Sequence, residues 1–122
     1  MSGLKRRYFA WQWMCLLLLC LSWAQGLHAQ VAPRAEGLLS QYERGMALFR
    51  AARYASAEEL FSKITAQSPQ KGDPEGLYAE AAYFKALCVT RLGRGDAPYE
   101  LLSFIEKYPA SLRVEQAKYE LG

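Results

Sequence analysis

The chain has 122 residues, of which 52% are hydrophobic and 22% charged, and its formal net charge is +3. This length predicts one domain, and the composition excludes a disordered acidic tail or a basic nucleic-acid arm. The segment 1–29 contains Lys5, Arg6 and Arg7, and without it the count of Lys and Arg falls from 15 to 12, equal to the 12 Asp and Glu. The remaining body is neutral, so we expect no nucleic-acid partner.

Residues 1–29 have the features of a secretory signal peptide. Basic residues at 5–7 precede a Leu-rich stretch at 15–21, and small residues follow around Ala24 and Ala29. The charges stay in the cytoplasm while the short apolar helix enters the translocon. Cleavage after Ala29, or alternatively after Ala24, predicts that the body lies in the periplasm or on the periplasmic face of a Gram-negative cell envelope.

Two alternatives to cleavage remain open. The apolar run 8–24, interrupted only by Gln12 and Ser22, is at the short limit for an uncleaved membrane anchor. In that case this segment is the only predicted contact with the membrane. Lipid attachment at Cys20 is disfavoured because Leu19 occupies the place of the small residue that such sites require.

The body shows helical periodicity after a linker at 30–35. Apolar residues from Leu38 to Phe49 recur with a period near 3.6. The expected helices are two within 36–67 separated by a turn at 51–54, one at 77–92, one from Asp96 to the Tyr108-Pro109 stop, and one from Ser111 that is still running at Gly122. Asp96 is the expected N-cap of its helix. No segment shows the pattern of a strand, so the predicted fold class is all-α.

One short pattern recurs along the body. An aromatic residue is followed three positions later by a small one, and this happens three times. The three pairs are Tyr42 and Gly45, Tyr83 and Ala86, and Tyr119 and Gly122. Pro69 and Pro109, which end the second helix of each unit, recur at nearly the same interval as Tyr42 and Tyr83. This indicates an internal repeat.

The first unit resembles the tetratricopeptide repeat, a helix–turn–helix of about 34 residues. The residues that match the spacing of this family are Gly45, Leu48, Tyr54, Ala57, Phe61, Ile64 and Pro69. The second unit departs from it at Pro98, near a position where a small Ala is expected. The tract Glu106–Ser111 is similar to the exported bacterial subgroup, which includes the Tol–Pal-associated periplasmic coordinator and the outer-membrane assembly lipoprotein.

The resemblance implies antiparallel helix hairpins stacked into a right-handed α–α superhelix, preceded by the signal peptide helix. It covers 36–122, with units at 36–69 and 75–109 and the start of a third at 111–122. Gly45 and Ala57 would lie where two helices approach closely, and Phe61 would fill the gap towards the next unit. Since repeats bury their cores against neighbours, we expect a longer array or another subunit to cover the last helix.

The body contains little that points to catalysis. It has no His, and its single thiol, Cys88, stands between Leu87 and Val89 and is expected to be buried. A Ser-His-Asp or Cys-His arrangement and an ordinary zinc site are therefore excluded. We expect no enzymatic activity, no cofactor, no metal and no small-molecule substrate.

In the family that the chain resembles, the first helix of each unit lines a concave groove for peptides or partner helices. Carried onto this sequence, the candidate groove residues are Leu39, Tyr42, Met46, Phe49, Arg50, Tyr83, Leu87, Arg91 and Tyr119. Tyr and Arg are frequent anchors of interfaces. The predicted function is a non-enzymatic scaffold for protein–protein interaction. The alternative is a spacer region at the N-terminus of a longer protein whose functional domain lies beyond residue 122.

Overall fold

The computed structural model describes residues 12–15 and 33–122. The chain divides into two units, residues 1–33 and 34–122. In the first unit, residues 12–15 form one helical turn; the predicted signal peptide otherwise lies outside the described residues. The described residues contain helices and no strand, which confirms the all-α prediction.

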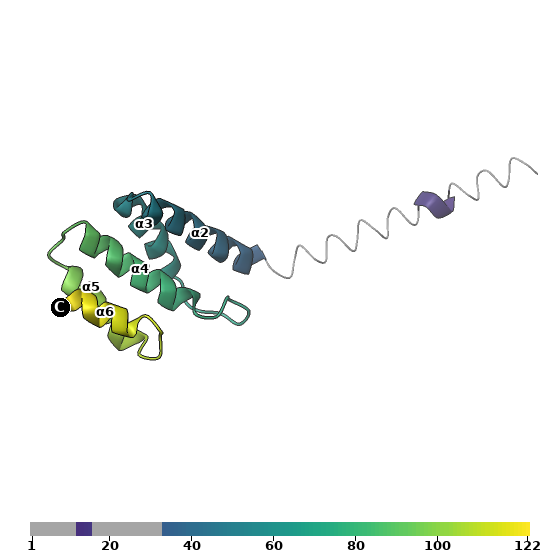
Figure 1. The fold of residues 1–122 in the computed structure, drawn as a ribbon. Coiled ribbons are helices and arrows are strands. Elements are labelled where there is room, and N and C mark those ends of the chain that lie inside the picture. The colour runs from purple at the N-terminus through teal and green to yellow at the C-terminus, as the bar shows by residue number, and fades with distance from the viewer. Residues whose placement is uncertain (1–11, 16–32) are drawn as a thin grey trace, which may run out of the picture. The chain divides into compact units, whose positions relative to one another are not determined.

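Helices α2 to α6 build the second unit, and each packs against the next one along the chain. Their bounds are α2 Pro33–Arg50, α3 Tyr54–Thr65, α4 Leu77–Arg91, α5 Ala97–Lys107 and α6 Val114–Leu121. The chain reverses direction at each connection, and α4 lies between the α2–α3 pair and the α5–α6 pair (Figure 1).

Two helices begin at other residues than predicted. Helix α2 begins at Pro33, so part of the predicted linker is helical; proline suits a first turn, where its missing N–H has no partner to lose. Helix α6 begins at Val114 instead of Ser111, whose hydroxyl accepts a hydrogen bond from the backbone N–H of Arg113 at 3.2 Å. Its last helical residue is Leu121.

Asp96 precedes α5 as expected but does not cap it. No side-chain hydrogen bond to the helix N-terminus is formed. The carboxylate instead accepts hydrogen bonds from Arg94 Nε at 3.2 Å and Arg94 Nη2 at 3.0 Å. The carboxylate oxygens of Asp96 are thus bound by the Arg94 guanidinium, two residues away, instead of by the backbone N–H groups at the start of α5.

Helix α4 is the centre of the core and is buried on nearly all sides. Ala81 and Ala86 are fully buried, and their small side chains let neighbouring helices approach closely. Phe84 joins the two ends of the core, with its ring centroid 5.3 Å from that of Phe49 in α2 and 5.2 Å from that of Tyr83. The Tyr83 ring in turn lies 5.6 Å from Phe104 in α5.

Gly45 and Ala57 are both buried, as the repeat pattern predicted, and the side chain nearest to Gly45 is that of Phe61. A Cβ atom at Gly45 would lie 2.7 Å from Cε1 of Phe61, so the glycine makes room for an aromatic ring. Phe61 is fully buried and stacks on Phe84 of the next helix pair at 6.0 Å, in agreement with its predicted role. Tyr54 packs edge-on against Phe49 at the turn between α2 and α3.

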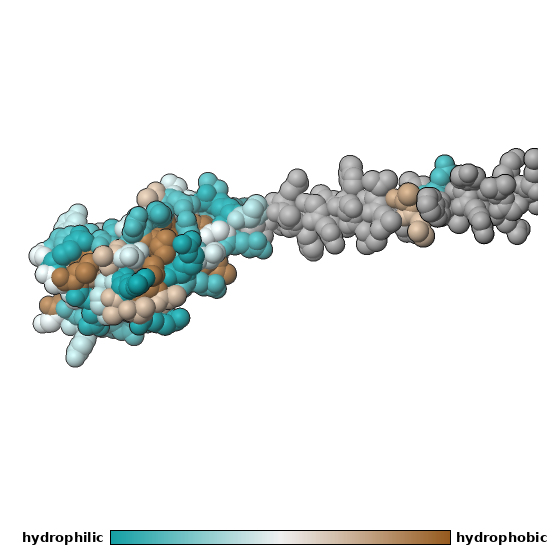
Figure 2. All heavy atoms as spheres, turned by 90° about the horizontal axis from the view of Figure 1, so that it is seen from above, coloured by the Kyte–Doolittle hydropathy of each residue, from teal (hydrophilic) through white to brown (hydrophobic). Residues whose placement is uncertain are grey.

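Polar and apolar groups alternate over the face of the unit drawn in Figure 2. The most exposed large apolar side chains of residues 33–122 are Leu112 at 96% and Tyr119 at 85%. Both belong to α6 or to the connection that leads into it. In the part of the chain that the structure describes, no helix is long and apolar enough to cross a membrane.

Candidate functional site

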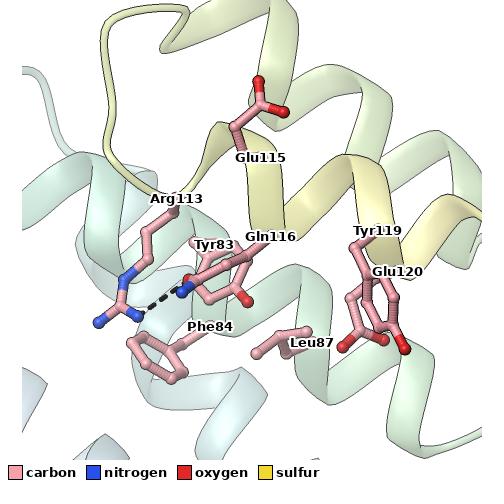
Figure 3. A pocket seen from close by; sticks show the side chains of 8 residues that line it. All are labelled: Tyr83, Phe84, Leu87, Arg113, Glu115, Gln116, Tyr119 and Glu120. Atoms are coloured by element: carbon pink, nitrogen blue, oxygen red, sulfur yellow. Dashed lines mark hydrogen bonds between the residues drawn. The ribbon is translucent and has the colours of Figure 1, made fainter.

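An open hollow of about 550 Å³ lies between α4 and α6. Figure 3 shows the side chains that line it, which come from these two helices and from the residue before α6. They are Tyr83, Phe84, Leu87, Arg113, Glu115, Gln116, Tyr119 and Glu120. The hollow is thus formed by two first helices of the predicted repeat units.

Helix α4 supplies the apolar floor of the hollow. Tyr83, Phe84 and Leu87 lie within about one turn of each other and are all more than nine-tenths buried. Burial raises the pKa of the Tyr83 hydroxyl above its ordinary value of 10.0, so this group remains neutral. Tyr119 of α6 adds an exposed aromatic ring at the rim, so the hollow has both an apolar floor and a large exposed side chain beside it.

Arg113 closes one end of the hollow. Its Nε donates to Glu80 Oε1 at 3.0 Å and its Nη2 to Glu80 Oε2 at 3.2 Å, while Nη1 donates to Gln116 Oε1 at 3.0 Å. The guanidinium carbon also lies 5.5 Å from the ring centroid of Tyr83 and 5.4 Å from that of Phe84. The hydrogen bond to Glu80 raises the pKa of Arg113 further, so the cation is permanent.

The α2 residues predicted for the groove lie outside this hollow. Tyr42 is half-buried, and its hydroxyl donates to Glu80 Oε2 at 3.5 Å. Burial and the neighbouring carboxylate raise its pKa. Met46 and Phe49 pack against the core, whereas Leu39 is 43% exposed. Tyr42 and Phe49 therefore serve the packing of α2 on α4.

Arg50 and Arg91, the two arginines predicted for the groove, are exposed and also lie outside the hollow. Arg91 approaches Glu120, with 3.9 Å between Nη2 and Oε1, a distance at which an exposed pair contributes little. Arg50 forms no ion pair with any residue that the structure describes. Of the predicted groove residues, the structure brings Tyr83, Leu87 and Tyr119 together.

Sequence reasoning missed Phe84, Arg113, Glu115 and Glu120 as lining residues. Phe84 directly follows Tyr83 in the sequence. A helical pattern that selects one face of α4 through Tyr83 leaves out the adjacent residue. Arg113 stands before the helix in an irregular connection, where no periodicity predicts its direction.

A second polar cluster joins the start of α2 to the connection between α3 and α4. Asp73 Oδ1 accepts a hydrogen bond from Arg34 Nε at 3.0 Å, and Oδ2 accepts from Tyr78 Oη and from the backbone N–H of Gln70, both at 2.7 Å. The bond from Arg34 and these two others lower the pKa of Asp73 to about 2. The cluster is a structural clamp that fixes α2 across 39 residues of sequence.

Glu58 and Cys88 also have structural surroundings. Glu58 pairs with Arg94 at 2.7 Å. Cys88 is fully buried, as predicted, and burial raises the pKa of its thiol to about 12. Among residues 12–15 and 33–122, no cluster of three His, Cys, Asp or Glu side chains has the arrangement of a metal site.

No family model, no curated protein and no solved structure matches the chain.

Proposed function

We propose that residues 33–122 form tetratricopeptide-like helix hairpins whose first helices, α2, α4 and α6, present a binding face to a protein partner in the cell envelope. The observation that carries this proposal is the open α4–α6 hollow, with its apolar floor and the 85% exposed Tyr119 at its rim. Such a rigid surface loses little ordering entropy when a peptide or a helix binds.

Lateral contacts support the repeat interpretation. Glu80 of α4 is bonded both to Tyr42 of α2 and to Arg113 beside α6, so the first helices are neighbours. The ends of α2 and α4 are also alike. Each is followed by a residue with positive φ, Ala52 at 58° and Gly93 at 67°, and the interval between these two equals that between Tyr42 and Tyr83. We infer a right-handed superhelix from this stacking by analogy with the family.

The envelope location is proposed from the sequence of residues 1–29, with the cationic start and short apolar run of a signal peptide. A non-enzymatic role is proposed because the body has no His and its acidic side chains at 58 and 73 are held by arginines. The spacer alternative differs in one respect: it requires no partner on the α4–α6 face.

A photo-crosslinking amino acid at position 119 tests the proposal in intact cells. We expect an adduct with one envelope protein, whereas the same probe at Tyr99, which is 72% exposed on α5, gives none. With the partner purified, Tyr119→Ala is expected to weaken binding about tenfold, as for an aromatic interface anchor, and Tyr99→Ala to leave it unchanged. Equal adducts at both positions, or none at 119, would support the spacer alternative.

Reversing the charge of the exposed arginines also distinguishes a binding scaffold from a spacer. Arg50→Glu with Arg91→Glu should weaken capture of the partner if these side chains contact it, and the assembly size should stay the same. A spacer that joins copies of the chain would change its assembly size instead, which size-exclusion chromatography with light scattering measures.

A further inference from the structure

Helix α6 is the least buried of the helices that form the hollow. It has eight residues, and Ala117 is its only fully buried side chain; Val114 and Leu121 are partly buried against the core. A helix this short is not stable by itself in water, so contacts outside it must define its place. Two contacts with α4 are polar: Arg113 with Glu80, and Arg91 with Glu120.

These two contacts differ sharply in quality. Arg113 binds Glu80 through two nitrogen atoms at 3.0 and 3.2 Å, and its planar group lies over the Tyr83 and Phe84 rings. A guanidinium that binds a carboxylate through two nitrogen atoms and also lies over aromatic rings fixes both the distance between the two helices and their relative orientation. Arg91 and Glu120 make a single contact at 3.9 Å, which fixes neither the distance nor the orientation of the helices.

Glu80 extends the effect of Arg113 beyond α6. Its Oε2 accepts hydrogen bonds from Arg113 Nη2 and, at 3.5 Å, from the hydroxyl of Tyr42 in α2. Its Oε1 accepts from Arg113 Nε. The Glu80 carboxylate, near the start of α4, therefore links α2 on one side to Arg113 and α6 on the other. It lies close in sequence to the floor residues of the hollow.

We infer that Arg113 is the positioning residue of the α4–α6 hollow. By holding α6 against Glu80, it keeps the space between the helices open before a partner arrives, and it places Tyr119 at the rim. The inference rests on the proposed function for its biological meaning, but the position of α6 is measured without any partner.

Hydrogen exchange on the full chain tests this inference. In Arg113→Met the fork and the charge are lost while most of the apolar stem is kept, and we expect amides of 114–121 to exchange at least tenfold faster than in the parent chain. Exchange in α3 should stay within twofold. The matched control is Arg91→Met, which removes the weaker contact between the same helices and should change exchange in α6 by less than twofold.

Further variants keep the test decisive if Arg113→Met unfolds the whole chain. Arg113→Lys retains the cation but not the fork, and Glu80→Gln retains the shape but not the charge. Both should accelerate exchange in α6 and leave exchange in α3 within twofold of the parent chain. Unchanged exchange in α6 in these variants, or an equal effect from Arg91→Met, would overturn the inference. Faster exchange in α6 as expected, together with no crosslink at position 119, would instead reject the proposed function and leave the positioning role intact.

Discussion

Gly45 shows how one missing side chain shapes the contact between α2 and α3. An added Cβ would lie 2.7 Å from Cε1 and 2.9 Å from Cζ of Phe61, distances that real Cβ atoms do not adopt. The ring has little room to retreat, because Phe61 is fully buried between Tyr42 and Phe84. The position therefore requires glycine for space, not for backbone freedom.

Gly45→Ala is expected to destabilise the chain although alanine favours helices. Overpacking costs about 1–3 kcal/mol, and the helix propensity of Ala returns about 1 kcal/mol. Gly37→Ala is the matched control in the same helix, since nothing lies within 4 Å of its Cβ position, and it should gain about 0.5–1 kcal/mol. Urea unfolding followed by circular dichroism measures both, and a Gly45→Ala chain as stable as Gly37→Ala would contradict the crowding argument.

The close contact at Gly45 was predictable at the scale of single residues, but the partner of each residue was not. The spacing of Tyr42, Gly45, Ala57 and Phe61 predicted correctly that a tight contact lies in the first helix pair. It could not tell that the ring of Phe61, rather than the backbone near Ala57, faces Gly45. That choice depends on the rotation of α3 about its axis, which neighbouring helices determine.

At the scale of elements, α2 and α4 end in the same hydrogen-bonded turn. The backbone N–H of Arg53 donates to the carbonyl of Leu48, and that of Arg94 to the carbonyl of Val89, with the same separation along the chain in both. The residue between helix and loop adopts positive φ in both, Ala52 in one turn and Gly93 in the other. This is the Schellman end of a helix, in which glycine is strongly favoured.

Exchanging glycine and alanine at positions 52 and 93 should change the stability of the chain in opposite directions. Ala52→Gly should stabilise the chain by about 1 kcal/mol by removing the strain of a left-handed alanine, and Gly93→Ala should destabilise it by about the same amount. Thermal unfolding of both variants gives the answer. If the two substitutions shift the melting temperature in the same direction, the turns are not equivalent.

Asp73 makes the attachment of α2 dependent on pH. Its folded pKa of about 2 lies below the ordinary value of 3.8, so the contribution of this carboxylate to stability is complete above about pH 4 and disappears as the pH falls through 2. Asp73→Asn should lower the urea midpoint at pH 7 and flatten its decline between pH 4 and 2.

Asp96→Asn is the control for Asp73→Asn. The pKa of Asp96 is also lowered by an arginine, Arg94, but its side chain is 46% exposed against 7% for Asp73. Solvent screens such a pair, so this variant should have nearly the pH profile of the parent chain. Identical profiles for both variants would show that the clamp does not depend on the charge of Asp73.

The helices were largely predictable, because periodic apolar residues and proline stops act locally. The errors fall at their ends, where a few competing side chains decide. Pro33 and Arg34 were assigned to a linker, yet the bond from Arg34 to Asp73, 39 residues away, holds them in the first turn of α2. Asp96 was expected to cap α5, yet Arg94 takes its carboxylate.

At the scale of the whole molecule, Cys88 reports on the cooperativity of the fold. It lies on α4, in the middle of the core, with no exposed surface and with a pKa of about 12. A thiol in this state is neither ionised nor accessible near neutral pH. Its reaction with an alkylating reagent therefore requires that the helices around α4 separate.

Cys88 should react with N-ethylmaleimide at least about a thousandfold more slowly than the exposed Cys15 in native buffer, because only the rare open state exposes it. Mass spectrometry of peptides resolves the two sites in one sample of the uncleaved chain. In rising urea, the labelling of Cys88 should follow the loss of helix by circular dichroism. Rapid labelling of Cys88 without urea would show that the unit opens locally around α4.

The sequence by itself determined that this protein is helical and where most of its helices start and stop, because helix period and breaker residues act over a few neighbouring positions. The tertiary structure decided which side chains meet: the hollow between α4 and α6, the clamp of Arg34 on Asp73, and the bond between Arg113 and Glu80. These contacts join residues far apart in the chain, and their geometry depends on the rotation and spacing of whole helices, which no local pattern encodes.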